Sequence, residues 1–398
     1  MIKRVEYFEK LIKCKDKELI KVITGVRRCG KSTLLLMYKN YLLENGVNES
    51  HIIFINFENL DNEELTNYKT LYKYINDRIV DNDKYYIILD EIQNVYQFQK
   101  TIESLYLKKN VDIYITGSNA YMLSSEIATL ISGRYIQIEM LPLSYKEYRE
   151  GIENNAKYNS LITYIENSSF PQVMQFINDR ELVKEYIDNL FNTIVVKDIL
   201  NRNRISDIII FKSILRFVID NIGTNISSKR ISDSLTLDGR KVDAKTVEKY
   251  INAMMESYIL YQVKRYNIKG KQYLKSQEKY YIVDVGFKYS FVPNSRLDIG
   301  HVIENIVYLE LIRRGYKVYI GKVNEYEIDF MASKENDIKY IQVSASIRDS
   351  HTYEREMRPL KSISDNYEKI ILTLDNDIES NDNGVKIINV EKWLLGKV

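Results

Sequence analysis

Short apolar runs alternate with longer stretches of helical periodicity through the first 140 residues of the chain. The runs at residues 19–24, 51–58, 84–92, 111–119 and 135–140 have the length of strands. They are apolar at nearly every position, which is typical of parallel strands covered on both faces. The pattern therefore predicts an α/β fold built on a parallel sheet.

The pattern changes after residue 143. Residues 144–217 carry apolar positions at helical spacing and indicate a helical segment. Two helices and two alternating runs follow, the runs flanking Asn267-Ile-Lys-Gly270 like the arms of a hairpin. We expect four parts: a sheet domain at 1–143, a helical lid at 144–217, a winged-helix domain at 218–290 and an α/β domain at 291–398.

Composition narrows the class of protein. The chain has 398 residues, a net charge of +2 and only two cysteines and three histidines, too few for a disulfide framework or a zinc site at the usual spacing. No apolar run approaches the ~18 residues of a membrane span, and the N-terminus is unlike a secretory signal. We expect a cytoplasmic protein without a membrane partner.

The sequence Gly25-Val-Arg-Arg-Cys-Gly-Lys-Ser-Thr33 lies between the first strand and a helix. It fits the pattern G-x-x-x-x-G-K-S, in which backbone N–H groups surround the phosphates of a nucleotide. Lys31 is expected at the β- and γ-phosphates and Ser32 on Mg²⁺. We expect nucleotide contacts from Gly25, Val26, Arg27, Arg28, Cys29, Gly30, Lys31, Ser32 and Thr33. Cys29 has two readings, a redox switch or a small tolerated residue, and we favour the second.

Two acids stand at the carboxyl end of the strand predicted in residues 84–92. Asp90 is placed to hold the metal ion, and Glu91 to act as general base on the attacking water. The alternative is an acidic pair that caps the next helix. We favour catalysis because the phosphate loop lies upstream in the same predicted sheet.

Three further positions could complete the site. Asn119 or Ser118, after the next strand, could hydrogen-bond the γ-phosphate or the water, or cap a helix. Arg134 could act as an arginine finger in a neighbouring subunit or pair with a surface carboxylate, and these remain evenly balanced. Arg27 and Arg28 are alternatives within the same chain. ATP is favoured over GTP because the Asn-Lys-x-Asp motif is absent.

The phosphate loop, Leu89-Asp-Glu-Ile-Gln93, Ile115-Thr-Gly-Ser-Asn119 and Leu141-Pro-Leu-Ser-Tyr145 resemble, in this order, prokaryotic AAA-type, archaeal-ATPase-like proteins with a C-terminal DUF4143-type domain. We expect the run at residues 51–58 to add a strand between the loop strand and the Asp90 strand, as in the additional-strand, catalytic-glutamate branch of P-loop ATPases. The DUF4143-type family usually has Gly-Gly-Phe-Pro in its lid, whereas this chain has Ser168-Ser-Phe-Pro171. A close backbone approach of the lid to the nucleotide is therefore not expected.

Positive charge gathers in the predicted winged helix. Residues 229–279 hold twelve Lys/Arg against six Asp/Glu, a local charge of +6 that leaves −4 for the rest of the chain. DNA is the partner we expect, with a protein partner as the alternative. The candidate contacts are Lys245, Lys249, Lys269 and Lys271.

The last hundred residues resemble a restriction-endonuclease-like core with an altered site. Glu304 lies in a predicted helix and Asp329 in a strand, but Gln342 and Ser344 stand where a carboxylate and a lysine are needed. An amide is a poor Mg²⁺ ligand and serine supplies no cation. We expect an inactive domain; an active nuclease would use Glu304, Glu327 and Asp329.

Together these patterns predict an enzyme that binds ATP and Mg²⁺, hydrolyses ATP and moves its C-terminal domains, acting on DNA. The first alternative is a nucleotide-controlled signalling switch that binds a protein. The second is an ATP-dependent nuclease. A homo-oligomer is consistent with an arginine finger at Arg134.

Overall fold

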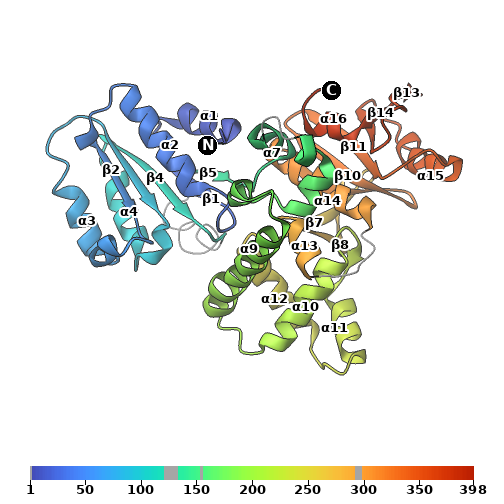
Figure 1. The fold of residues 1–398 in the computed structure, drawn as a ribbon, viewed down its shortest axis with the longest axis horizontal. Coiled ribbons are helices and arrows are strands. Elements are labelled where there is room, and N and C mark those ends of the chain that lie inside the picture. The colour runs from blue at the N-terminus through green and yellow to red at the C-terminus, as the bar shows by residue number, and fades with distance from the viewer. Residues whose placement is uncertain (1, 121–132, 153–155, 292–297) are drawn as a thin grey trace. The chain divides into compact units, whose positions relative to one another are not determined.

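The computed structural model describes residues 2–120, 133–152, 156–291 and 298–398, and the chain folds into two compact units (Figure 1). The first unit comprises the chain up to Pro142 together with Glu256–Tyr258. The second comprises Leu143–Met255 and Ile259–Val398.

The first unit contains a five-stranded sheet in the order β2-β3-β4-β1-β5, in which all neighbouring strands are parallel. Its strands are β1 (Ile20–Thr24), β2 (Ile52–Asn56), β3 (Tyr85–Asp90), β4 (Val111–Gly117) and β5 (Tyr135–Glu139). The predicted α/β class and parallel sheet are thus confirmed. The strand between β1 and β3 is β4, whereas β2 lies at the sheet edge. The expectation that the run at residues 51–58 lies between the loop strand and the Asp90 strand is therefore wrong, because β2 pairs with the far side of β3 and its place along the chain does not give its place in the sheet.

Successive side chains of a strand point to opposite faces of the sheet, and their contacts show which helices cover each face. Ile113 and Ile115 join a core with apolar residues of α3 and α4, whereas Tyr114, between them, meets Tyr38 of α2 with 2.6 Å between the hydroxyl oxygens. The sheet is therefore buried on both faces, which explains its nearly continuous apolar strands. The helical elements of this unit are α1 (Val5–Cys14), α2 (Lys31–Glu44), η1 (Glu49–His51), η2 (Leu60–Leu65), α3 (Tyr68–Asn76), η3 (Ile92–Asn94) and α4 (Phe98–Tyr106).

The second unit begins with helices, as its apolar spacing predicts. They are α7 (Tyr145–Ile152), η4 (Ala156–Tyr158), α8 (Leu161–Asn167), η5 (Pro171–Gln175), α9 (Arg180–Thr193), the π-helical η6 (Ile194–Asn201) and α10 (Ile208–Asp220).

The segment Ser168-Ser-Phe-Pro171 lies against the turn before α13 (Gly286–Phe291). Ser168 has a φ of 76°, a conformation that glycine adopts more readily. The Ser169 backbone N–H donates to Asp284 Oδ2 at 2.6 Å, and its hydroxyl donates to the same oxygen. A side chain at Gly286 would clash with Ser168, so this glycine permits the close approach. The serine pair therefore has a structural role within the second unit.

Helix, turn, helix and hairpin follow at the expected positions. Ser227 caps α11 by accepting from the Arg230 N–H, and α12 buries Val247, Tyr250, Ile251 and Met254. These elements are β6 (Asn225–Ile226), α11 (Ser228–Leu237), α12 (Ala244–Glu256), β7 (Leu260–Asn267) and β8 (Gln272–Ile282).

The hairpin β7–β8 belongs to the same sheet as the C-terminal strands, because β7 pairs in parallel with β9. The nine strands run in the order β13-β14-β12-β11-β10-β9-β7-β8-β6. One sheet therefore extends across the expected boundary at residue 290. The remaining elements are α14 (Ile299–Arg313), β9 (Lys317–Val323), β10 (Tyr326–Lys334), β11 (Asp337–Ser344), α15 (Ser350–Lys361), β12 (Glu368–Thr373), β13 (Ser380–Asp382), β14 (Val385–Asn389) and α16 (Val390–Leu394).

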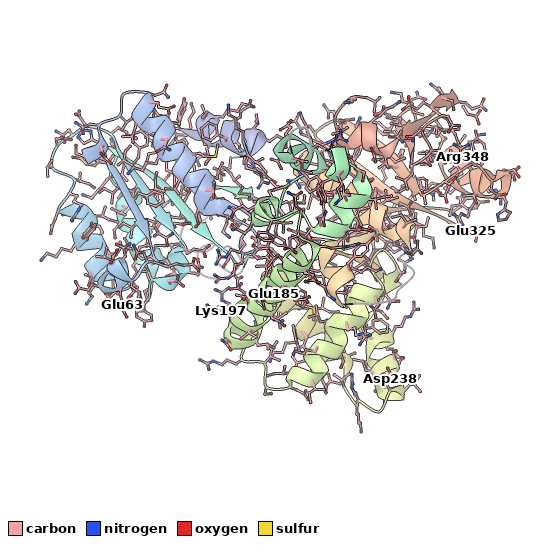
Figure 2. All side chains as sticks on the ribbon, viewed as in Figure 1. Glu63, Glu185, Lys197, Asp238, Glu325 and Arg348 are labelled. Atoms are coloured by element: carbon pink, nitrogen blue, oxygen red, sulfur yellow. The ribbon has the colours of Figure 1, made fainter. Side chains whose placement is uncertain are left out.

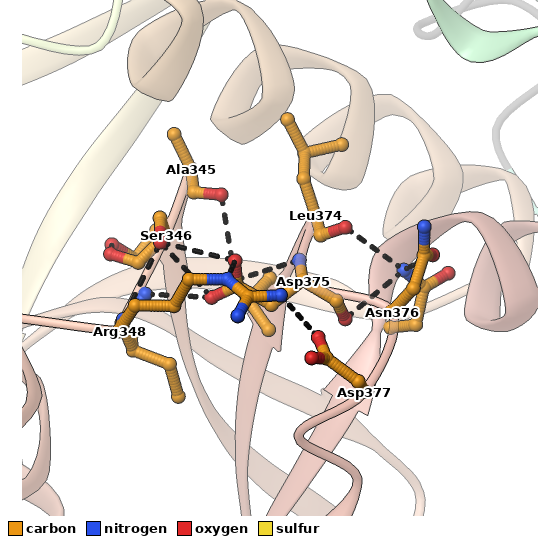
Figure 3. A network of polar contacts seen from close by, with 11 residues as sticks. Ala345, Ser346, Arg348, Leu374, Asp375, Asn376 and Asp377 are labelled. Atoms are coloured by element: carbon orange, nitrogen blue, oxygen red, sulfur yellow. Dashed lines mark hydrogen bonds and ion pairs between the residues drawn. The ribbon is translucent and has the colours of Figure 1, made fainter.

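A polar network fixes the carboxyl ends of β11, β12 and β14 (Figure 3). Asp375 accepts from the Ile347 N–H at 2.8 Å and from the Arg348 guanidinium at 3.1 Å. Asn389 donates to the carbonyl oxygens of Leu374 and Asp375 at 3.3 Å each. The loop after β11 is thus held in place by side-chain contacts rather than by strand pairing.

Charged side chains such as Glu63, Glu185 and Lys197 project from the ribbon into solvent (Figure 2). Trp393 is buried under the guanidinium of Arg314, 4.1 Å from the ring centre, as expected for a packing residue. Within the described parts of the chain, no helix is long and apolar enough to cross a membrane.

Candidate nucleotide-binding site

The phosphate loop joins the end of β1 to the start of α2. Gly25 and Gly30 have φ values of 142° and 110°, which side chains disfavour. A Cβ at Gly25 would lie 2.1 Å from the Met140 carbonyl oxygen, so the loop can pass this backbone only with glycine. The predicted helix begins at Lys31, which leaves its first N–H groups at the loop.

Lys31 is buried and its ammonium group contacts the loop itself. Nζ donates to the carbonyl oxygens of Gly25 and Val26 at 3.1 and 3.3 Å and lies 3.5 Å from Glu91 Oε1. Burial alone would lower the pKa of Lys31, but the Glu91 carboxylate outweighs it and raises the pKa above its usual value. The group therefore stays charged.

Asp90 ends β3 and is held from both neighbouring strands. Thr116 of β4 donates to Oδ1 at 2.6 Å, and Asn56 of β2 donates to Oδ2 at 2.8 Å. The Ser32 hydroxyl also hydrogen-bonds this carboxylate, and burial still raises the Asp90 pKa. The structure thus brings together the two predicted metal ligands.

Glu91 follows in a left-handed conformation, with a φ of 55°. Its backbone N–H donates to Thr116 Oγ1 at 2.8 Å, which aims the side chain at the loop rather than along the next helix. Gln93 donates to the carboxylate. Burial would raise the pKa of Glu91, but Lys31 lowers it below its usual value, so the carboxylate is ionised. Glu91 makes no side-chain cap of the following helix, which contradicts the capping alternative.

These residues fit a magnesium nucleotide. A serine hydroxyl and an aspartate carboxylate are oxygen ligands of the kind that Mg²⁺ prefers. Gln93 Oε1 is buried without a hydrogen-bond partner among the described residues, so the site has an acceptor available for a ligand or water. Ser118 and Asn119 are buried after β4, at the same sheet edge as Asp90.

The remaining loop residues differ in exposure. Val26 and Cys29 are buried and can offer only backbone groups, and burial raises the pKa of the Cys29 thiol. A thiol of raised pKa is a poor redox switch, in keeping with the interpretation favoured from the sequence. Arg27 pairs with Glu58 at 2.7 Å, while Arg28 and Thr33 are exposed.

Arg134 lies at the end of the sheet where β1 and β5 begin, opposite to the end that carries the phosphate loop. It precedes β5, whose first residue pairs with Ile20 at the start of β1, while the loop follows the end of β1. Its guanidinium lies 5.4 Å from the Tyr106 ring centre. Arg134 is therefore remote from the phosphate loop of its own chain. A catalytic role would have to be in a neighbouring subunit, and this stays a prediction, as does pairing with a surface carboxylate.

The candidate residues of the second unit are all described by the structure. Lys245 and Lys249 are exposed on α12, and Lys269 and Lys271 are exposed at the hairpin tip. Glu304, Asp329 and Ser344 line one cavity of about 540 Å³. Gln342 Oε1 accepts from the Asp329 N–H at 2.7 Å.

Comparisons with known proteins agree with this geometry. An AAA domain model matches residues 17–149. An uncharacterized protein of Haemophilus influenzae is 37% identical over 400 residues, which cover 99% of each chain. The chain belongs to this family of AAA-domain proteins. The first unit is of the P-loop ATPase class.

Two further relatives of this AAA-domain protein are more distant. Protein MJ1544 of Methanocaldococcus jannaschii is 29% identical and covers 94% of this chain and 88% of its own. The solved structure of a Walker-type ATPase of Pyrococcus abyssi has a TM-score of 0.53 at 14% identity, covering 73% of this chain and 96% of that one. This likeness shows the fold alone.

One expectation from the resemblance is wrong. The model that matches after the AAA domain is a domain of unknown function, DUF8612, over residues 158–298, and not DUF4143. It covers helices and the hairpin of the second unit rather than the last hundred residues. Most of the motifs that suggested the DUF4143-type family lie within the AAA domain, so they say little about the domain that follows.

Arg4 is a residue of the AAA-domain site that motif analysis missed. Its buried guanidinium donates to the Cys29 carbonyl at 2.9 Å, and to the Leu141 and Pro142 carbonyls at 2.6 and 3.2 Å. It thereby joins the phosphate loop to the segment after β5. No local signal marks it, because its partners are backbone atoms 25 and more than 130 residues away.

We predict that Arg4→Met raises the KM for ATP about tenfold, equivalent to ~1.4 kcal/mol, because the loop loses its anchor. The Arg4→Lys variant should recover part of the effect. Steady-state ATPase kinetics and thermal unfolding measure both. Lys10→Met is the control, since Lys10 also donates from α1 to a backbone carbonyl, at Gln137, away from the loop. An unchanged KM in Arg4→Met would contradict the positioning role.

Proposed function

We propose that this protein hydrolyses ATP with Mg²⁺ and uses the cycle to move its C-terminal segments on DNA. One observation carries the ATPase proposal: Lys31, Ser32, Asp90 and Glu91 meet at one edge of the parallel sheet. They supply a cation for phosphates, two ligands for a metal and an ionised carboxylate.

The contacts suggest how binding and catalysis are linked. Lys31 is held by two loop carbonyls and Glu91, acceptors that the β- and γ-phosphates can replace. Once Lys31 turns to the phosphates, Glu91 loses its cation and is left with Gln93 as the partner that orients it toward water. Bound Mg²⁺, held through Ser32 and Asp90, supplies charge neutralisation of the phosphates. Glu91 then takes a proton from the attacking water, and Ser118 or Asn119 contacts the γ-phosphate or that water.

The DNA proposal rests on exposed charge in the helix and hairpin. Lys245 and Lys249 occupy the face of α12 opposite its buried apolar residues, and Lys269 and Lys271 occupy the tip between β7 and β8. Such lysines contact phosphates and position a helix in a groove.

Glu91→Gln is expected to lower kcat by about 10²- to 10⁴-fold, the usual contribution of a general base, while ATP remains bound. Lys31→Ala should impair binding or turnover. Single-turnover hydrolysis and retention of labelled ATP measure these effects. Glu63→Gln is the control, because it makes the same carboxylate-to-amide change at an exposed position of the same unit. Wild-type rates in both site variants would refute the ATPase proposal.

The double variant Lys269→Glu, Lys271→Glu is expected to weaken DNA binding at least tenfold and to flatten its salt dependence, because fewer counterions are released. Fluorescence anisotropy at several salt concentrations measures this. Lys184→Glu with Lys197→Glu makes the same charge change on exposed helix positions of the same unit and should have little effect. If neither pair alters binding, or if ATPase activity is indifferent to DNA, a protein partner becomes the better proposal.

Mixing Lys31→Ala subunits with Arg134→Ala subunits should restore hydrolysis, because one variant keeps the loop and the other keeps the arginine. The ATPase rate of the mixture, compared with each variant alone, measures the effect. Restoration shows that Arg134 acts between chains of an oligomer. Full activity of Arg134→Ala alone would show that the arginine has no catalytic part.

A further inference from the structure

Three carboxylates of the second unit converge from two elements. Glu304 lies on α14, and Glu327 and Asp329 lie on β10. In the endonuclease-like core that the sequence resembles, acids at such positions hold a divalent cation.

Lys279 of β8 already occupies the place between them. Its Nζ lies 2.9 Å from Glu304 Oε1, 3.2 Å from Glu327 Oε1 and 3.5 Å from Asp329 Oδ1. Only 6% of its side chain is exposed. The ammonium group hydrogen-bonds Glu304 and forms ion pairs with Glu327 and Asp329, so its contacts go to three different carboxylates.

The acids also accept from other groups of the chain. Asp329 Oδ2 accepts from the Val343 N–H at 2.9 Å, and the Tyr281 hydroxyl donates at 2.6 Å to Glu304 Oε1, the oxygen that Lys279 also contacts. Glu327 Oε2 accepts from Asn225 at 2.9 Å and lies 3.4 Å from Arg265. Each acid therefore has a cation and a further hydrogen-bond donor from the chain itself.

Gln342 is used in a way that a carboxylate could not match. Its Oε1 accepts from the Asp329 N–H at 2.7 Å, and its Nε2 donates to Glu356 Oε2 at 2.8 Å. The second of these contacts requires an N–H donor, which the amide has and an ionised carboxylate lacks. Both polar atoms of Gln342 are therefore engaged within the sheet and helix.

Electrostatics agree with this geometry. Burial would lower the pKa of Lys279, but Glu304, Asp329 and Glu327 together raise it well above its usual value, so the ammonium persists. Burial raises the pKa of Glu304 to about 7 despite its contact with Lys279, because the Glu304 side chain is the most deeply buried of the three acids.

We infer that Lys279 is the resident cation of this carboxylate cluster, so that the second unit binds no divalent metal there and does not cleave phosphodiester bonds. A lysine of the hairpin replaces a metal ion as the link between β8, β10 and α14. This inference is independent of the ATPase and DNA proposals.

Mn²⁺ binding to the full chain without nucleotide tests the inference, measured by electron paramagnetic resonance and calorimetry. The wild type should show no Mn²⁺ site that is lost on Asp329→Asn. Lys279→Ala should gain one Mn²⁺ site, with an affinity at least tenfold higher than that of any such site in the wild type. The double variant Lys279→Ala, Asp329→Asn should lose this site. Lys279→Arg, which keeps the charge, and Lys264→Ala, an exposed change on the same hairpin, should gain none.

Two results would overturn the inference. One is an Asp329-dependent Mn²⁺ site, or Asp329-dependent nicking of supercoiled DNA with Mg²⁺ or Mn²⁺, in the wild type. The other is a folded Lys279→Ala protein, judged by circular dichroism, that gains no metal. If Lys279→Ala does not fold, the wild-type titration and nicking assay decide, and absence of both signals supports the inference.

Discussion

A lysine ammonium group that leaves water needs acceptors on several sides, and this requirement organises both units. Lys21 in β1 is fully buried against Asp112 of β4, Lys31 is buried among loop carbonyls and Glu91, and Lys279 is buried among three carboxylates. Removing one member of a buried ion pair leaves an unpaired charge and costs roughly 3–5 kcal/mol. Each of these buried lysines therefore requires a carboxylate beside it in the fold.

The surroundings of Lys31 and Lys279 show why one favours ligand binding and the other does not. Lys31 has two neutral carbonyl partners and a carboxylate 3.5 Å away, so an incoming phosphate offers a stronger acceptor than the ones it displaces. Lys279 has carboxylates at 2.9, 3.2 and 3.5 Å, and these acids have further donors of their own. A metal entering that cluster would have to displace a cation that is already well matched.

The sequence predicted the parts of the ATP site that a local pattern encodes. The glycine spacing, the helix start at Lys31 and the acids after β3 were all found, because each depends on neighbours within a few residues. Thr116, Asn56 and Arg4 were not found, because their roles arise from pairing between strands or from backbone atoms far along the chain. A motif gives the groups that touch a nucleotide, and the fold supplies the groups that hold them.

Charge counting along the sequence was less reliable for the same reason. The excess of +6 at residues 229–279 includes Arg265 and Lys279, whose partners Glu304, Glu327 and Asp329 lie beyond the segment counted. These two cations pair with acids of the second unit and add little to the surface. The positive surface thus depends on exposed lysines such as those at the hairpin tip. Lys279 links β8 to β10 and α14, and the Ile268 N–H at the tip donates to the Lys322 carbonyl of β9, so the hairpin backbone is held at both ends while the Lys269 and Lys271 side chains are exposed. Exposed lysines on a backbone held in this way suit contact with a polyanion, and they link the structural lysine to the proposed binding surface.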